Sequence, residues 1–184
     1  MGIPDGNRRA VFLDRDGVIN RADVRAGRPF APLRLEDLEI LPGVAPALGR
    51  LHDAGFRLVV VTNQPEIARG TLGRDVVDAM HASLAAALPL DEFRVCAHDD
   101  ADGCDCRKPK PGLLQMAARD GGLDLHDSFM IGDRWRDIDA GRRAGCTTIF
   151  IDRSYDEPPP PAPDATVASL SDAADWILSH NQHV

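Results

Sequence analysis

Five short apolar runs recur along the chain, and segments with helical periodicity separate them. None of the runs has a polar face, which is typical of strands buried on both sides of a parallel sheet. We therefore predict strands over residues 10–14, 56–62, 93–98, 127–132 and 146–151. Alternating strands and helices of this kind form an α/β fold with an open, doubly wound parallel sheet.

Helices are predicted between these strands, where apolar residues recur three or four positions apart. The segments are residues 44–51, 76–88, 113–117, 138–144 and 173–178. Gly55 and Gly145 stand where a helix ends, and Pro111 stands where one begins. The prolines of residues 158–163 predict a stiff loop before a last strand and helix. We expect residues 1–184 to form one domain, because this length is ordinary for a single core.

The chain carries 29 acidic and 21 basic residues, which gives a net charge of −8. Nucleic acids and anionic membranes bind basic surfaces, so this balance argues against both as partners. A small anionic substrate is compatible with it, because a bound metal or a local group of cations outweighs the global charge. Residues 1–9 lack the apolar run of a signal peptide, and no apolar run is long enough to span a bilayer. We expect a cytoplasmic, monomeric protein.

Two carboxylates follow the first predicted strand, in residues 14–20 (DRDGVIN). In extended chain, residues two apart point the same way, so Asp14 and Asp16 can face one site. Their repulsion is relieved by a cation or by a proton on one of them. Such a pair can supply a nucleophile that also binds metal, and a general acid that later acts as a base. A polar junction between strand and turn is the alternative interpretation.

Polar side chains also follow two other strands, and ligands of open α/β sheets bind at these strand ends. The hydroxyl of Thr62 can donate to a phosphate oxygen, or it can cap a helix. Asp133 adds a third carboxylate, which together with Asp14 and Asp16 would form an oxygen-only site suited to Mg²⁺. Capping of the next helix is the alternative for Asp133.

Three cysteines and a histidine lie close together at and after the third strand, as Cys96, His98, Cys104 and Cys106. Four such ligands complete a tetrahedron and leave no open position, as in a structural zinc site. Buried or reactive thiols are the alternative, but residues 99–103 (DDADG) are too polar to bury them. Arg107 and Lys108 follow directly, so a bound zinc would fix the loop that carries them.

In chain order these segments resemble the four motifs of the haloacid dehalogenase superfamily of phosphatases. Residues 14–17 resemble the first motif, Thr62 the second, Lys108 the third and residues 132–137 (GDRWRD) the fourth. The resemblance covers residues 10–151 and implies a haloacid dehalogenase-like, Rossmannoid fold. The segments between the motifs are too short to hold a separate cap domain, so short loops must exclude water from the site.

The resemblance also implies a mechanism. Asp14 would attack phosphorus and form an aspartyl-phosphate, while Asp16 would act as general acid and then base. Mg²⁺ would be held by Asp14, Asp133 and the backbone carbonyl of Asp16, with Lys108 and Thr62 on the phosphoryl group. Asp137 would orient the magnesium shell from behind. The expected substrate-binding residues are Asn63, Gln64, Arg69, Arg107 and Arg134.

Two branches of the superfamily match more narrowly. Residues 12–20, 61–64 (VTNQ) and 67–70 (IARG) resemble the phosphatases of heptose biosynthesis, which remove the C7 phosphate of D-glycero-D-manno-heptose 1,7-bisphosphate. Histidinol-phosphate phosphatases carry a similar zinc loop. The short gap between His98 and Cys104 favours that second branch, as does Glu66, whose carboxylate suits an amine.

We expect the heptose bisphosphate as substrate and keep histidinol phosphate as the alternative. Lys110 adds a further cation for a second phosphate. A zinc-stabilised module that binds phosphate esters without catalysis is a third hypothesis, from another class of function. It is disfavoured because every motif residue named above is present in the chain.

Overall fold

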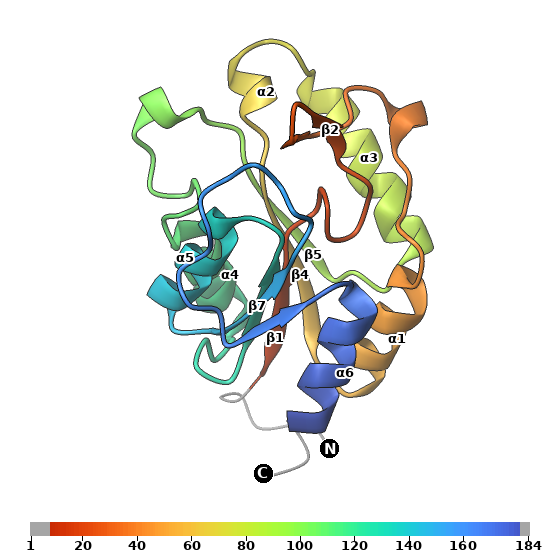
Figure 1. Ribbon diagram of the computed structural model, residues 1–184, viewed down its shortest axis with the longest axis vertical. Helices are drawn as coiled ribbons and strands as arrows, with labels where there is room; N and C mark the ends of the chain where they lie inside the picture. Colours follow the sequence, from red (N-terminus) through yellow and green to blue (C-terminus); the bar gives the residue numbers. More distant parts are fainter. Residues whose placement is uncertain (1–7, 181–184) are drawn as a thin grey trace.

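A parallel sheet of six strands forms the centre of the protein in a computed structural model that describes residues 8–180 (Figure 1). Residues 1–7, part of the segment examined for a targeting signal, lie outside the described range. The strand order is β5-β4-β1-β6-β7-β8, and every neighbouring pair is parallel. The strands are β1 (Ala10–Leu13), β4 (Arg57–Asn63), β5 (Glu92–Cys96), β6 (Phe129–Gly132), β7 (Thr147–Ile151) and β8 (Ala165–Val167). The predicted α/β fold is confirmed.

Helices cover both faces of this sheet (Figure 1). On one face lie α1 (Val44–Asp53), α3 (Arg74–Ala87) and α6 (Leu170–His180), and on the other lie α4 (Gly112–Gly121) and α5 (Trp135–Ala144). Successive residues of β1 alternate between the two cores, with Val11 in the first and Phe12 in the second. This alternation explains why the strand sequences lack a polar face.

The predicted helix ends are mostly where the structure has them. Gly145 follows the last residue of α5 with φ +92°, and Gly55 follows the cap of α1 with φ +86°, a region that favours glycine. Pro111 is the residue before α4 and not its first residue. Its ψ of 3° is not helical, and its carbonyl accepts the first intrahelical hydrogen bond, from Gln115.

Short inserts follow the strand ends, where short loops are expected to exclude water, but their hairpin and helical turns were not predicted from the sequence. β2 (Asp23–Arg25) and β3 (Arg28–Phe30) form an antiparallel hairpin with a two-residue turn, and α2 (Pro65–Ala68) is one helical turn. The 3₁₀ turns η1 (Leu35–Asp37) and η2 (Asp100–Asp102) complete the set. Within residues 8–180, these inserts and the loop after β7, which carries Tyr155 and Glu157, lie at the strand ends, in agreement with a fold without a separate cap domain. No helix of the described part could cross a membrane.

Candidate active site

Three buried carboxylates meet at the carboxyl ends of β1 and β6. Asp14 follows β1, Asp133 follows β6, and Asp137 lies in the first turn of α5. One oxygen from each lies within 4.8 Å of the others. Because β1 and β6 are parallel neighbours, the residues after them end at the same edge of the sheet. We call Asp14, Asp133 and Asp137 the carboxylate cluster.

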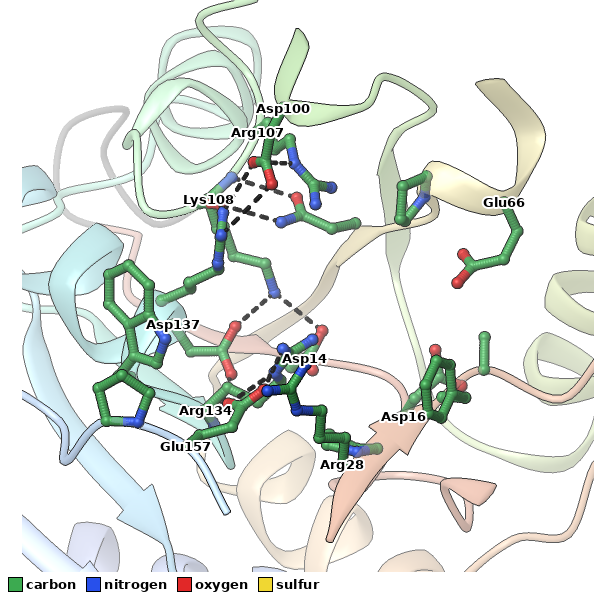
Figure 2. A pocket seen from close by; sticks show the side chains of 18 of the residues that line it. Asp14, Asp16, Arg28, Glu66, Asp100, Arg107, Lys108, Arg134, Asp137 and Glu157 are labelled. Atoms are coloured by element: carbon green, nitrogen blue, oxygen red, sulfur yellow. Dashed lines mark hydrogen bonds and ion pairs between the residues drawn. The ribbon is translucent and has the colours of Figure 1, made fainter. Parts of the chain in front are cut away.

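Lys108 supplies the positive charge inside this cluster (Figure 2). Its Nζ lies 2.8 Å from Oδ1 of Asp14 and 2.7 Å from Oδ1 of Asp137, and the side chain is 2% exposed. Burial lowers the pKa of a lysine, but the two carboxylates outweigh it and raise the pKa of Lys108 above its usual range. Asn63 holds the backbone of Lys108 through two hydrogen bonds of 3.1 Å. Lys108 is therefore a charged group in a fixed place.

One ammonium does not neutralise three carboxylates. Burial, followed by repulsion from Asp137, raises the pKa of Asp14 to about 6. Burial and the charges of Asp14 and Asp137 raise the pKa of Asp133 well above its usual value. Oδ2 of Asp133 accepts from the hydroxyl of Tyr155 at 2.8 Å, whereas its Oδ1 is buried and has no hydrogen-bond partner among the described residues. Excess negative charge and an unpaired buried oxygen fit a hard divalent cation such as Mg²⁺.

Gly17 leaves room for this arrangement. A Cβ atom there would lie 1.8 Å from Oδ2 of Asp133 and 2.8 Å from the hydroxyl of Tyr155. Its φ of +86° is also a conformation that other residues rarely adopt. Only glycine therefore allows the first motif to lie this close to Asp133.

The carboxylate of Asp16 lies apart from the carboxylate cluster and has its own partners. Oδ1 accepts from Asn20 at 2.9 Å, and Oδ2 accepts from Gln64 at 2.9 Å. The guanidinium of Arg15, which is fully buried, donates to both oxygens at 3.0–3.1 Å. The amide of Gln64 also donates to the hydroxyl of Thr62 at 2.9 Å. Sequence analysis missed Arg15, although a charged residue between two strand-end aspartates was a visible signal.

A cavity of about 530 Å³ opens over Asp14 and Lys108 (Figure 2). Of the expected substrate-binding residues, Asn63 and three arginines line it, but each arginine already has a carboxylate partner within hydrogen-bond distance. These pairs are Arg69–Asp99, Arg107–Asp100 and Arg134–Glu157. Thr62 and Gln64 are buried behind the wall, and Lys110 donates to the backbone carbonyls of residues 103 and 104 instead of facing the cavity. Arg28, from the unforeseen hairpin, also lines the cavity and forms no ion pair within residues 8–180.

The four metal-ligand candidates of the loop after β5 also come together. We call Cys96, His98, Cys104 and Cys106 the thiol cluster. Its sulfur–sulfur distances are 3.2, 3.5 and 3.7 Å, and Nδ1 of His98 lies 3.3 Å from the sulfur of Cys106. The cysteines form no disulfide. A tetrahedral zinc with Zn–S bonds of about 2.3 Å separates its sulfurs by about 3.8 Å, so this donor set fits zinc.

Comparison with known proteins defines the class. A family model described as HAD-hyrolase-like matches residues 105–173, which include Lys108 and Asp133. A curated relative is 37% identical to the chain and matches 94% of it and 97% of the relative. The chain belongs to the haloacid dehalogenase-like hydrolases.

That relative is the D-glycero-D-manno-heptose-1,7-bisphosphate 7-phosphatase of Thermosynechococcus vestitus. The D-glycero-beta-D-manno-heptose-1,7-bisphosphate 7-phosphatase of Pseudomonas aeruginosa is 36% identical over 79% of this chain and 82% of its own. Among solved structures, the D,D-heptose 1,7-bisphosphate phosphatase of B. bronchiseptica in complex with magnesium and phosphate is 30% identical. It has a TM-score of 0.82 and covers 94% of this chain and 99% of its own. The family expected from the sequence is confirmed.

Proposed function

We propose that this protein is a magnesium-dependent phosphatase that removes the C7 phosphate of D-glycero-D-manno-heptose 1,7-bisphosphate. The observation that carries the proposal is Asp14 in the wall of the cavity, paired with charged Lys108 and grouped with the other members of the carboxylate cluster. The names of the relatives support the substrate. Mg²⁺ would be held by Asp14, Asp133 and the backbone carbonyl of Asp16, and when bound it neutralises phosphoryl charge.

The residues of the chain divide the reaction into two steps. Asp14 forms a bond to phosphorus as the bond between phosphorus and the sugar oxygen breaks, and Asp16 gives that oxygen a proton. Water then attacks phosphorus, the bond to Asp14 breaks, and Asp16 takes a proton from the water. Lys108 lies within reach of a phosphoryl oxygen next to Asp14 and keeps its charge throughout. Asp137 holds Lys108 and accepts from the backbone N–H of Arg134, which makes it a positioning residue.

Recognition of a second phosphate rests on the cavity rim. Arg28 has no carboxylate partner in the described part, so it can bind a phosphate without breaking an existing pair. Arg107 and Arg134 would have to leave Asp100 and Glu157 to do the same. We therefore place the distal phosphate beside Arg28.

Histidinol phosphate is the second candidate, and Glu66 is the observation that favours it. Glu66 lines the cavity from α2, and its Oε2 is buried with no hydrogen-bond partner in residues 8–180 (Figure 2). A sugar hydroxyl or a substrate ammonium could each donate to that oxygen. The deciding experiment measures kcat/KM for heptose 1,7-bisphosphate, fructose 1,6-bisphosphate and histidinol phosphate under one set of conditions. The heptose bisphosphate should give the highest value, and a tenfold preference for histidinol phosphate would establish the second candidate instead.

The non-catalytic alternative makes a simpler prediction. A binding module without catalysis releases no phosphate, whereas the proposed enzyme releases it from a generic aryl phosphate only when Mg²⁺ is present. Asp14→Asn is the matched control, because it keeps the shape of the side chain. Phosphate release by the wild type and none by the variant would exclude the binding module.

The thiol cluster, we propose, holds one structural zinc ion per chain. The fit of its four donors to a tetrahedron supports this. Elemental analysis of untagged protein purified without chelators should give one zinc per chain, and the absence of any metal would refute the site. We further propose that the protein is a monomer and is located in the cytoplasm. Light scattering coupled to size-exclusion chromatography tests whether it is a monomer.

A further inference from the structure

Arg15 and His81 form a buried contact that the mechanism above does not use. Arg15 is the largest fully buried side chain of the described part, and its Nη1 lies 3.2 Å from Nε2 of His81. A guanidinium has only donors, so Nε2 of His81 must be the acceptor and the ring proton must be on Nδ1. Burial, followed by the charge of Arg15, lowers the pKa of His81 to about 4. His81 is therefore a neutral acceptor for Arg15.

Packing fixes the orientation of the His81 ring. His81 lies on α3, and its ring stacks on Phe93 of β5 with centroids 4.6 Å apart and an interplanar angle of 21°. The other charged groups that act on the ring are Asp16, Asp78 and Arg74. A rigid stacked ring that accepts from Nη1 leaves Nε and Nη2 of Arg15 aimed at Asp16.

We propose that Arg15 and His81 are positioning residues that hold the carboxylate of Asp16 where it transfers a proton to the leaving oxygen. The inference rests on the proposed function of Asp16. Asn20, from the same loop, and Gln64, which follows β4, hold the same carboxylate, so Arg15 adds a third point of support. Proton transfer depends on distance, and a displacement of about 1 Å at a reacting group can cost about 100-fold in rate. His81, a neutral histidine in the core, thus affects the proton transfer by Asp16 through Arg15.

Two substitutions of His81 separate positioning from filling of the core. His81→Phe keeps a ring that can stack on Phe93 but removes the acceptor. His81→Gln gives up the ring but places an acceptor near the position of Nε2. If His81 only filled the core, His81→Phe would be the more active of the two variants. If His81 positions Arg15, His81→Gln should be the more active one. Both are assayed well below their melting temperatures, so that folded protein is compared.

The measurement compares an alkyl phosphate with p-nitrophenyl phosphate, whose leaving group needs no proton. For His81→Phe we expect kcat on heptose 1,7-bisphosphate to fall about 10- to 100-fold, with KM nearly unchanged and little change on the aryl ester. His81→Gln should restore most of the loss. Arg15→Lys, which keeps the charge but loses the two-point contact with Asp16, should show the same selective defect as His81→Phe.

Equal losses on both esters, or better activity in His81→Phe than in His81→Gln, would overturn the positioning role. The proposed function fails separately, if the wild type releases phosphate from neither ester. Wild-type activity on both esters together with an unaffected His81→Phe would reject this inference and leave the proposed function standing.

Discussion

The carboxylate cluster and the thiol cluster bring together similar numbers of metal-binding side chains, but they are held in different ways. Asp14 and Asp133 follow two central strands, and all three carboxylates of their cluster are buried. In the thiol cluster Cys96 ends an outer strand and is buried, whereas Cys104 and Cys106 lie on a loop and are half-buried. The sheet therefore fixes the first cluster, whereas the second lies mostly on a loop whose other contacts include the ion pairs Arg69–Asp99 and Arg107–Asp100, so a bound ligand would contribute more to its shape.

The two clusters also differ in how the charge of their side chains is compensated. Lys108 and Tyr155 already contact the carboxylates, so the cluster is partly compensated without a cation. The thiols chiefly face one another and His98. A site that is preorganised can lose its metal and keep its shape, whereas a site made by its metal cannot. The predictions below test this contrast, from the largest expected effect to the smallest.

Asp14→Asn should remove activity and leave the fold intact. Loss of the nucleophile should reduce kcat by more than about 10⁴-fold. The melting temperature should stay the same or rise, because burial already disfavours the ionised carboxylate. Steady-state kinetics and thermal melts check both, and retention of more than about a hundredth of wild-type activity would contradict the assignment of Asp14.

Lys108→Met should affect both activity and stability. It leaves Asp14 and Asp137 as buried charges without their shared partner, which costs on the order of 3–5 kcal/mol. Added Mg²⁺ should raise the melting temperature of this variant more than that of the wild type, since the cation replaces the missing positive charge. An equal response of the two proteins to Mg²⁺ would show that the cation does not compensate these carboxylates.

The pH dependence of stability should carry the signature of Asp14. Its pKa is about 6 in the folded protein and about 3.8 when unfolded, so the folded state binds the proton more tightly. The contribution of Asp14 to stability is therefore greatest below about pH 4 and is lost as pH rises through about 6, by roughly 3 kcal/mol. The observable is the difference in unfolding free energy between metal-free wild type and Asp14→Asn. A difference independent of pH from 4 to 7 would contradict the raised pKa.

Cys106→Ser should weaken the thiol cluster and, through it, Lys108. We expect loss of zinc, a lower melting temperature and a loss of about 10- to 100-fold in kcat/KM. Cys146→Ser is the matched control, because Cys146 is buried in the core far along the chain from the loop and belongs to no ligand cluster of the described residues. Equal zinc contents in the two variants would show that Cys106 is not a ligand.

The fold, and the meeting of Asp14 and Asp133 at the ends of strands, could be predicted from the sequence because both follow from the local pattern of apolar residues. Apolar periodicity identified β1 and β6, and parallel strands bring Asp14 and Asp133 to one edge. Contacts between distant segments left no such pattern, and neither the pairing of Lys108 with Asp137 nor that of Arg15 with His81 was foreseen.

Contacts that sequence pattern does not reveal also explain why Arg69, Arg107 and Arg134 were expected to be free to bind the substrate. Their residue type suits a phosphate, but the sequence pattern does not reveal their carboxylate partners, and those of Arg69 and Arg134 come from distant segments, as Glu157 does for Arg134. The hairpin that presents Arg28 has strands of three residues and no apolar alternation, so periodicity could not reveal it. Short inserts and long-range ion pairs therefore had to be found in the structure.

Hydrogen exchange before and after metal removal tests the contrast between the two clusters most directly. The backbone amides of residues 97–107 and of residues 129–137 are compared in the metal-loaded and the metal-free protein. If the metal fixes the thiol cluster and the sheet fixes the carboxylate cluster, residues 97–107 lose protection on metal removal and residues 129–137 retain it. Loss of protection in both segments, or in residues 129–137 alone, would contradict the account.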